Sequence, residues 1–377
     1  MKARRNGDER YDARFMRRAA ALARRGEGLT RPNPPVGAVL VRGGRIIGEG
    51  WHHAAGLPHA EAEAIAAAGS GGKARGATLY VTLEPCSTAG RQPPCADAIV
   101  RAGIRRVFCG AADPNPENAG GAAPVLAAAG IPLAMAQEAG GVREAAECEA
   151  LIEGFRSAQL RGRPYVLLKL GISMDGRTAD AEGASKWITG EVSRRRVQAL
   201  RRAADAVMVG AGTVRADNPS LLPRPARGRE PWRVVVAGQG TLPEEAQLFT
   251  DAAAERTIVA ARAGWHPGLA RRLAVQGVQI WEFTEKTEDF LPAVLRRLAA
   301  ECGAMRVLCE GGGGLAGALL KGGLADEIRL FAAPVVLGGP GGMAGGACWP
   351  VAAPARFRLA GPPRRSGADL ELRYLPA

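Results

Sequence analysis

One histidine, two cysteines and one glutamate have the types and the order needed for metal chemistry. Glu61 follows His59 at the second position, and Cys86 and Cys95 come further along. An imidazole and two thiolates form the ligand set that zinc takes when its fourth tetrahedral position stays open for water or substrate. Glu61 is left over, and its carboxylate can take a proton from that water and return it to a leaving group. We therefore predict a catalytic zinc site with Glu61 as the proton carrier.

The order of these residues is typical of zinc-dependent nucleobase deaminases, in which His-x-Glu is followed by Pro-Cys and a second Cys. That pattern usually has two residues between the cysteines, whereas this chain has the longer loop from Ser87 to Pro94. We interpret the other cysteines as packed or surface residues: Cys109, Cys148, Cys302, Cys309 and Cys348. A structural zinc site is an alternative that needs a fourth protein ligand, for which Cys109 is the open candidate.

Local sequence patterns place the four residues at the ends of regular elements. The alanine-rich segment 60–68 favours a helix, so His59 and Glu61 lie in its first turn, where an anionic carboxylate is stabilised. An apolar, β-branched strand is predicted ahead of Cys86, and a further helix begins at Cys95. The two helix N-termini and the strand end would together form a cup for the ion.

The loop and its flanks resemble those of the bifunctional deaminase-reductases of riboflavin biosynthesis. The shared motifs are Gly90-Arg91-Gln92-Pro93-Pro94-Cys95, Arg31-Pro32-Asn33-Pro34 and Asp113-Pro114-Asn115-Pro116. The family commonly has a histidine within the loop where this chain has Thr88 and Ala89. Those positions are not zinc ligands in the family, so the resemblance implies that metal binding is retained. Asn33 is predicted to reach a ligand with its amide, and an Asx turn before proline is the alternative.

Strand and helix patterns alternate along the chain, which predicts an α/β fold in two domains. A helix over about 142–160 closes the first alternation, and a second one starts at Tyr165. The resemblance implies a cytidine-deaminase-like three-layer domain over residues 1–160. It also implies a doubly wound domain over 164–377, similar in fold to dihydrofolate reductase.

A glycine-rich run over 311–314 follows a predicted strand and opens a predicted helix. Glycines let the backbone approach a phosphate, and the helix N-terminus supplies N–H donors. A simple loop is the alternative, because the full dinucleotide fingerprint with its downstream acid is absent. A second loop, from Gly210 to Thr213 with Asp217 beyond it, also follows a strand. The two loops together predict a nucleotide cofactor.

The resemblance continues through this second half, in Ser173-Met174-Asp175-Gly176-Arg177 and Ser185-Lys186-Trp187-Ile188-Thr189. It implies NADPH as the cofactor, in contact with Gly171, Trp187, Thr213, Asp217, Gly312, Gly313, Gly314, Leu315, Ala316, Gly317 and Ala318. It implies a ribose-phosphate substrate in contact with Ser185, Arg201, Leu221, Arg224 and Glu310. A solvated helix face is the alternative for Arg201. Lys169 is our candidate for assisting proton transfer, with a structural lysine as the equal rival.

Composition restricts the partners. The formal net charge of +13 invites a nucleic-acid interpretation, but the arginines are scattered and no basic run is interleaved with aromatic residues. We therefore predict a solvated basic surface and no nucleic-acid partner. No apolar run reaches membrane-spanning length and no export signal is visible, so a soluble protein is expected. Seven cysteines without framework spacing favour a reducing, cytoplasmic compartment.

Our hypothesis is an enzyme with two activities. Zinc and Glu61 would deaminate a phosphoribosylamino-pyrimidine, and NADPH would then reduce the ribose of the product to a ribityl chain. We also expect a homo-oligomer formed through the reductase domain. The main rival is a nucleobase or nucleic-acid deaminase whose second half is a non-catalytic nucleotide-binding domain.

Overall fold

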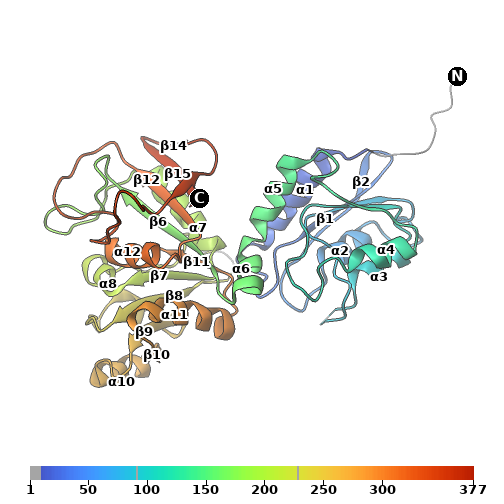
Figure 1. Ribbon diagram of the computed structural model, residues 1–377. Helices are drawn as coiled ribbons and strands as arrows, with labels where there is room; N and C mark the ends of the chain where they lie inside the picture. Colours follow the sequence, from blue (N-terminus) through green and yellow to red (C-terminus); the bar gives the residue numbers. More distant parts are fainter. Residues whose placement is uncertain (1–9, 91, 227–228) are drawn as a thin grey trace. The chain divides into compact units, whose positions relative to one another are not determined.

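The computed structural model describes residues 10–90, 92–226 and 229–377. The chain divides into two compact units, Met1–Arg161 and Gly162–Ala377 (Figure 1). The division lies next to the expected boundary between 160 and 164. Among the described residues, no helix is both long enough and apolar enough to span a bilayer.

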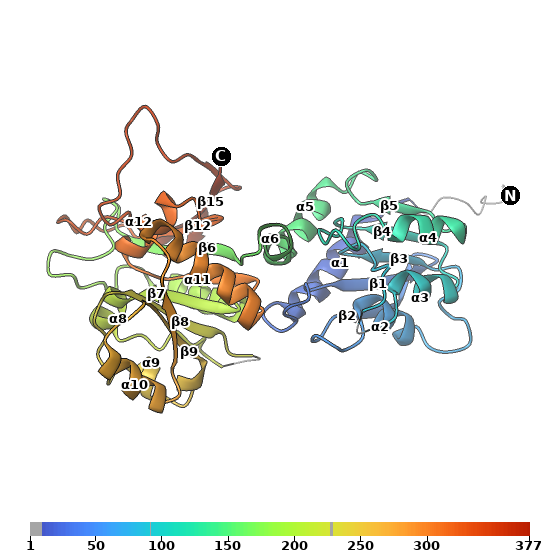
Figure 2. The same cartoon turned by 60° about the horizontal axis from the view of Figure 1, so that its bottom comes forward.

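The N-terminal unit is built on a sheet that has five strands within the described residues, in the order β2-β1-β3-β4-β5 (Figure 2). β1 runs antiparallel to β2 and β3, whereas β3, β4 and β5 are parallel. The strands are β1 (Gly37–Arg42), β2 (Arg45–Trp51), β3 (Thr78–Val81), β4 (Arg106–Cys109) and β5 (Leu133–Met135). The helices are α1 (Ala13–Ala23), the 3-10 turn η1 (Arg24–Gly26), α2 (Ala60–Ala67), α3 (Cys95–Arg101), α4 (Ala122–Ala128), α5 (Val142–Leu151) and α6 (Glu153–Arg161).

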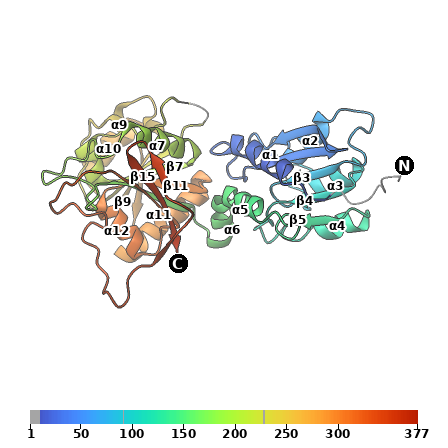
Figure 3. The ribbon, with the colours of Figure 1, turned by 90° about the horizontal axis from the view of Figure 1, so that it is seen from above.

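Helices cover both faces of this sheet, as the predicted three-layer arrangement requires (Figure 3). Side chains alternate along each strand, so neighbours point to opposite faces. Val39 and Tyr80 pack with α1 and α5, whereas Leu40 and Leu79 pack with α2, α3 and α4.

The single helix predicted over 142–160 is wrong, because two helices occupy this stretch. α5 ends at Leu151, and Ile152 leaves the helical conformation with ψ of 6° before α6 begins at Glu153. The side chain of Ile152 is fully buried in the core. The break therefore lies where the chain turns into the hydrophobic core, a tertiary feature that helical periodicity does not encode.

α2 lies directly on β2 because β2 presents glycines to it. A Cβ atom on Gly50 would be 2.3 Å from the carbonyl oxygen of Ala60, and one on Gly48 would be 2.2 Å from that of Ala64. Both distances are far below van der Waals contact, so only glycine permits this approach. The first turn of α2, which carries His59 and Glu61, is thereby set by contact with the backbone of the sheet.

The C-terminal unit has a sheet that, within the described residues, follows the order β10-β9-β8-β7-β11-β6-β12-β15-β13, with β14 paired to β15. The strands from β10 to β12 in this order are parallel, and β15 is antiparallel to β12. These strands are β6 (Tyr165–Ile172), β7 (Ala206–Gly210), β8 (Trp232–Gly238), β9 (Thr257–Arg262), β10 (Gln279–Phe283), β11 (Arg306–Cys309), β12 (Glu327–Ala332), β13 (Phe357–Leu359), β14 (Arg364–Ser366) and β15 (Asp369–Pro376).

Helices lie on both sides of the second sheet, with α11 and α12 on one face and α9 and α10 on the other (Figure 3). The helical elements are α7 (Glu191–Ala203), α8 (Ala211–Asp217), α9 (Gln247–Thr250), η2 (Ala254–Arg256), α10 (Pro267–Val275), α11 (Thr287–Cys302) and α12 (Gly313–Lys321). The predicted doubly wound α/β architecture is confirmed. In such sheets, ligands bind beyond the carboxyl ends of the parallel strands.

Candidate functional site

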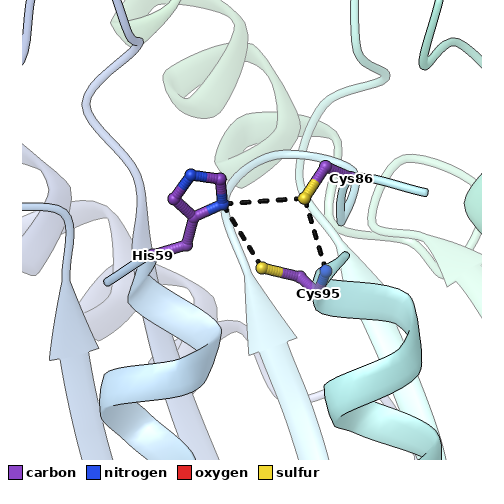
Figure 4. Close-up of side chains that lie close together, drawn as sticks. All are labelled: His59, Cys86 and Cys95. Atoms are coloured by element: carbon purple, nitrogen blue, oxygen red, sulfur yellow. Dashed lines mark hydrogen bonds between the residues drawn. The ribbon is translucent and has the colours of Figure 1, made fainter. Parts of the chain in front are cut away.

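The three predicted zinc ligands lie together in the N-terminal unit (Figure 4). His59 Nδ1 is 3.6 Å from Cys86 Sγ and 3.3 Å from Cys95 Sγ. A tetrahedral zinc ion with ligand bonds of about 2.0–2.3 Å separates a nitrogen and a sulfur ligand by roughly 3.6 Å. The donor set and its spacing therefore fit a zinc ion.

Two of the three ligands lie at the starts of helices, and Cys86 lies in the loop that follows β3. His59 is the N-cap residue of α2 but makes no side-chain capping bond, so its imidazole is available to a metal. Cys95 is the first residue of α3, and its backbone N–H donates to Cys86 Sγ at 3.3 Å. Hydrogen bonding from Cys95, joined by that from His59, holds the pKa of Cys86 well below its usual value despite burial. A thiolate is the form that binds metal.

Glu61 lies beside this group in the first turn of α2 and is only 3% exposed. Burial raises the pKa of Glu61 to about 7, although the neighbouring His59 opposes the change. A carboxyl group that titrates near neutral pH is suited to accept a proton and to return it. The geometry thus leaves Glu61 next to the metal ligands as an acid-base group.

Cys109 does not complete a four-ligand site. Its thiol is buried and donates to the carbonyl oxygen of Ala111 at 3.0 Å. Among the described residues, the metal-binding group consists of His59, Cys86 and Cys95. An open fourth position distinguishes a catalytic zinc site from a structural one.

A cavity of about 370 Å³ has His59, Glu61 and Cys86 in its wall, together with Asn33 and His52. His52 Nδ1 is 3.1 Å from the carbonyl oxygen of Pro58, and Asn33 Nδ2 is 3.0 Å from His52 Nε2. The carbonyl can only accept, so Nδ1 carries the proton and Nε2 accepts from the amide. Burial lowers the pKa of His52, which favours this neutral form.

No role for His52 is predicted from the sequence. Its role depends on contacts with Pro58 and Asn33, and no spacing rule links these three positions. Other wall residues without a predicted role are Glu84, Asp113, Asn115, Asn118, Phe155 and Gln159. The Asp113-Pro114-Asn115-Pro116 motif was a signal for two of them. Arg91 of the loop motif lies outside the described residues.

A larger cavity, of about 870 Å³, lies in the C-terminal unit beyond the carboxyl ends of β6, β7 and β11. It brings together most of the residues that the resemblance assigned to cofactor and substrate. The predicted residues in its wall are Lys169, Gly171, Ser185, Trp187, Arg201, Thr213, Asp217, Leu221, Arg224, Glu310 and Gly312. Ser185 Oγ donates to Asp217 at 2.7 Å, which ties two of these segments together.

The remaining predicted cofactor residues, Gly313 to Ala318, do not line this cavity. A Cβ atom on Gly313 would lie 2.5 Å from the carbonyl oxygen of Gly342, and one on Gly317 would lie 2.1 Å from that of Ala344. Close backbone packing therefore explains why glycine is required at positions 313 and 317. The wall of the cavity includes the start of the glycine run, where Gly312 N–H donates to Thr213 Oγ1 at 3.1 Å.

Three charged, partly buried side chains form a network in the second cavity. Arg201 Nε is 2.6 Å from Glu310 Oε1, and Lys169 Nζ is 3.3 Å from Glu310 Oε2. Burial alone raises the pKa of Glu310, but the charges of Lys169 and Arg201 outweigh it and lower the value to about 2. The side chain of Arg201 is 13% exposed, so the alternative of a solvated helix face is wrong.

Two family models match the chain in sequence. Residues 9–111 match the cytidine and deoxycytidylate deaminase zinc-binding region, and residues 164–358 match the RibD C-terminal domain. These two matches fall on the two units that hold the two cavities.

Individual proteins match over most of their length. The chain is 45% identical to riboflavin biosynthesis protein RibD of Bacillus amyloliquefaciens over 327 residues, 86% of this chain and 85% of that protein. It is 39% identical to RibD of Escherichia coli, over 87% of this chain and 89% of that protein.

Solved structures are similar over nearly the whole chain. The structure of Acinetobacter baumannii RibD has a TM-score of 0.83 and 37% identity, covering 97% of this chain and 98% of that one. A diaminohydroxyphosphoribosylaminopyrimidine deaminase/5-amino-6-(5-phosphoribosylamino)uracil reductase from Thermotoga maritima has a TM-score of 0.83 and 35% identity, with the same coverage.

Proposed function

Because the chain belongs to the RibD family of riboflavin biosynthesis, in which a deaminase is fused to a reductase, we propose how its residues serve the two reactions. The enzyme hydrolytically deaminates diaminohydroxyphosphoribosylaminopyrimidine with zinc. It then reduces the ribosyl chain of 5-amino-6-(5-phosphoribosylamino)uracil to ribityl with NADPH. The observation that carries the assignment is one chain with both the open His-Cys-Cys group and a second, charged cavity.

In the deamination, His59, Cys86 and Cys95 would hold zinc, which supplies Lewis-acid activation of a water molecule when bound. Glu61 takes a proton from the attacking water and returns it to the departing amino group, which leaves as ammonia. The pKa of about 7 lets Glu61 hold the proton between these two transfers. The amide of Asn33, fixed by His52, presents its oxygen to the pyrimidine.

The ligand assignment is tested by the metal content of a single variant. Cys95→Ser removes one thiolate, so purified Cys95→Ser should hold much less zinc than the wild type and should release no ammonia. Cys309→Ser, which changes a buried cysteine of the other unit, is the matched control and should keep its zinc. Full zinc content in Cys95→Ser would contradict the assignment.

In the reduction, NADPH supplies the hydride when bound, and the residues of the second cavity orient the reactants. We assign Gly171, Trp187, Thr213, Asp217 and Gly312 to the cofactor. We assign Ser185, Arg201, Leu221, Arg224 and Glu310 to the ribose-phosphate substrate. Arg224 has a guanidinium group suited to the phosphate. Lys169 is held by Glu310 and would donate a proton during ring opening of the ribose.

One assay tests the two activities together. Purified full-length protein with zinc, the phosphoribosylamino-pyrimidine and NADPH should release ammonia first and then consume NADPH in equal amount. The rival, a nucleobase or nucleic-acid deaminase with a non-catalytic second half, predicts tight, salt-sensitive polynucleotide binding and no NADPH oxidation. That outcome would overturn the proposal.

We also propose a homo-oligomer formed through the C-terminal unit. Three exposed apolar side chains, Val335, Val336 and Leu337, lie in the segment that follows β12. The exposed Met174 lies beside them, since its backbone N–H donates to the carbonyl oxygen of Val335. Exposed apolar groups that lie together are typical of protein interfaces. Light scattering of the full chain should give a multiple of 39.2 kDa, and Val336→Lys should shift the mass towards that of one chain. A wild type that stays monomeric at micromolar concentration would contradict this.

A further inference from the structure

Glu84 is a buried acid in the wall of the first cavity that the mechanism above does not use. It lies two residues before Cys86 and is 8% exposed. Its backbone N–H donates to the carbonyl oxygen of Ala111 at 2.9 Å, which continues the contact between the ends of β3 and β4. The carboxylate therefore points from the metal-ligand segment towards the chain that follows β4.

The carboxylate of Glu84 accepts three backbone N–H groups from that chain. Oε2 accepts from Asp113 at 3.2 Å and from Gly120 at 3.1 Å, and Oε1 accepts from Ala122 at 3.3 Å. These donors lie at both ends of the loop 113–121, which leads into α4. Hydrogen bonds to a carboxylate are stronger than those between neutral groups. One side chain thus fastens both ends of the loop.

The loop 113–121 carries three side chains into the cavity: Asp113, Asn115 and Asn118. Its outer part is also tied to the segment after Cys86, since Thr88 Oγ1 donates to Asn118 Oδ1 at 2.7 Å. Gly121 packs against Ser87, and a Cβ atom there would lie 2.1 Å from Ser87 Oγ. The segment 84–88 therefore carries a metal ligand and also contacts the loop 113–121.

We infer that Glu84 is a positioning residue that sets the amide side chains of the loop 113–121 at a fixed distance from the metal ligands, and so determines how the pyrimidine is oriented for deamination. The inference rests on the proposed deaminase function. Displacement of the side chains that contact the pyrimidine weakens the binding of substrate, which raises KM. Neither Glu84 nor its three donors need to touch the substrate for this effect.

The test is Glu84→Gln in the full-length, zinc-loaded enzyme. Glutamine keeps the shape but replaces one acceptor oxygen with an amide that donates, so it opposes at least one of the three N–H groups. The deaminase KM should rise roughly tenfold, the loss expected from one hydrogen bond to a charged group, while kcat changes less. Glu84→Asp, which keeps the charge on a shorter side chain, should give an intermediate KM.

Two further measurements separate positioning from general damage. Amide hydrogen exchange should accelerate in peptides that cover 113–122, while zinc content and reductase activity of the same preparation stay at wild-type values. Glu144→Gln is the matched control, because Glu144 is a buried acid of the same unit that pairs with Arg17 outside the cavity wall. Glu144→Gln should leave the deaminase KM unchanged.

An unchanged KM in Glu84→Gln would overturn the inference, and so would a loss of activity explained by lost zinc. If Glu84→Gln does not fold, Glu84→Asp decides the question by the same KM and exchange measurements. A wild type that releases no ammonia would refute the proposed function itself, whereas an active wild type with an insensitive Glu84→Gln refutes only the role of Glu84.

Discussion

Each of the two cavities has in its wall a glutamate with a largely covered side chain, and the two carboxyl groups behave in opposite ways. Burial raises the pKa of Glu61 to about 7, whereas Lys169 and Arg201 lower that of Glu310 to about 2. Burial disfavours the charged form in both cases, so the neighbouring cations make the difference. The first acid can exchange a proton near neutral pH, and the second stays an anion that holds two cations in place. The two glutamates thus differ in role, since Glu61 can serve acid-base chemistry and Glu310 serves electrostatic positioning.

The largest expected effect comes from removing the acid-base group. Glu61→Gln keeps the size of the side chain but cannot carry the proton, so ammonia release should fall by about 10²- to 10⁴-fold. NADPH-dependent reduction of the deaminated intermediate should be unchanged, because that reaction takes place in the other unit. The control is Glu63→Gln on the same helix, which contacts His53 and should keep both activities. Retained deaminase activity in Glu61→Gln would contradict the acid-base role assigned to Glu61.

An intermediate effect is expected from the pH dependence of stability in the C-terminal unit. The pKa of Glu310 lies below its usual 4.5, so its contribution to stability is present above pH 4.5 and is lost as the pH falls from 4.5 through about 2. The full contribution is on the order of 3 kcal/mol. Glu310→Gln should flatten the dependence of the free energy of unfolding on pH across this window, measured by denaturant titration.

The matched control for that measurement is Glu301→Gln. Glu301 pairs with Arg297 on the exposed surface of α11, with half of its side chain exposed. Surface ion pairs contribute little to stability, so this variant should keep the pH profile of the wild type. If both variants gave the same profile, the low pKa assigned to Glu310 would be wrong.

The smallest effect concerns Thr88, in the loop between the two cysteine ligands. Thr88→Val removes the hydroxyl that donates to Asn118 Oδ1, at a cost of about 0.5–1.5 kcal/mol, which limits the rise in deaminase KM to about tenfold. Zinc content should not change, because Thr88 does not belong to the metal-binding group. Loss of zinc from Thr88→Val would show that the contact between Thr88 and Asn118 is needed for metal binding.

The sequence was sufficient for those parts of the site that depend on residue type and local position. His59, Glu61 and Cys95 lie where helix starts were expected, and Cys86 follows its strand. The pairing of Glu310 with Lys169 and Arg201 was not predictable, because it joins three elements that are distant in the chain.

The same limit applies to the glycine-rich run. Its local pattern predicts phosphate contact, and the structure shows in addition that Gly313 and Gly317 pack closely against another backbone segment. Loops and helices that carry small residues for packing have the same local pattern as those that carry them for a ligand. Only contacts between distant segments distinguish the two cases.

The glycines of β2 have a consequence for how the deaminase centre responds to change. Since the backbone of α2 lies directly against Gly48 and Gly50 of β2, no side chain separates the helix from the sheet at these two positions. Hydrophobic substitutions in the core should therefore alter the melting temperature without altering metal affinity. The sheet backbone thus helps to place the first turn of α2, which makes this unit a suitable scaffold for redesigning the pyrimidine that it accepts.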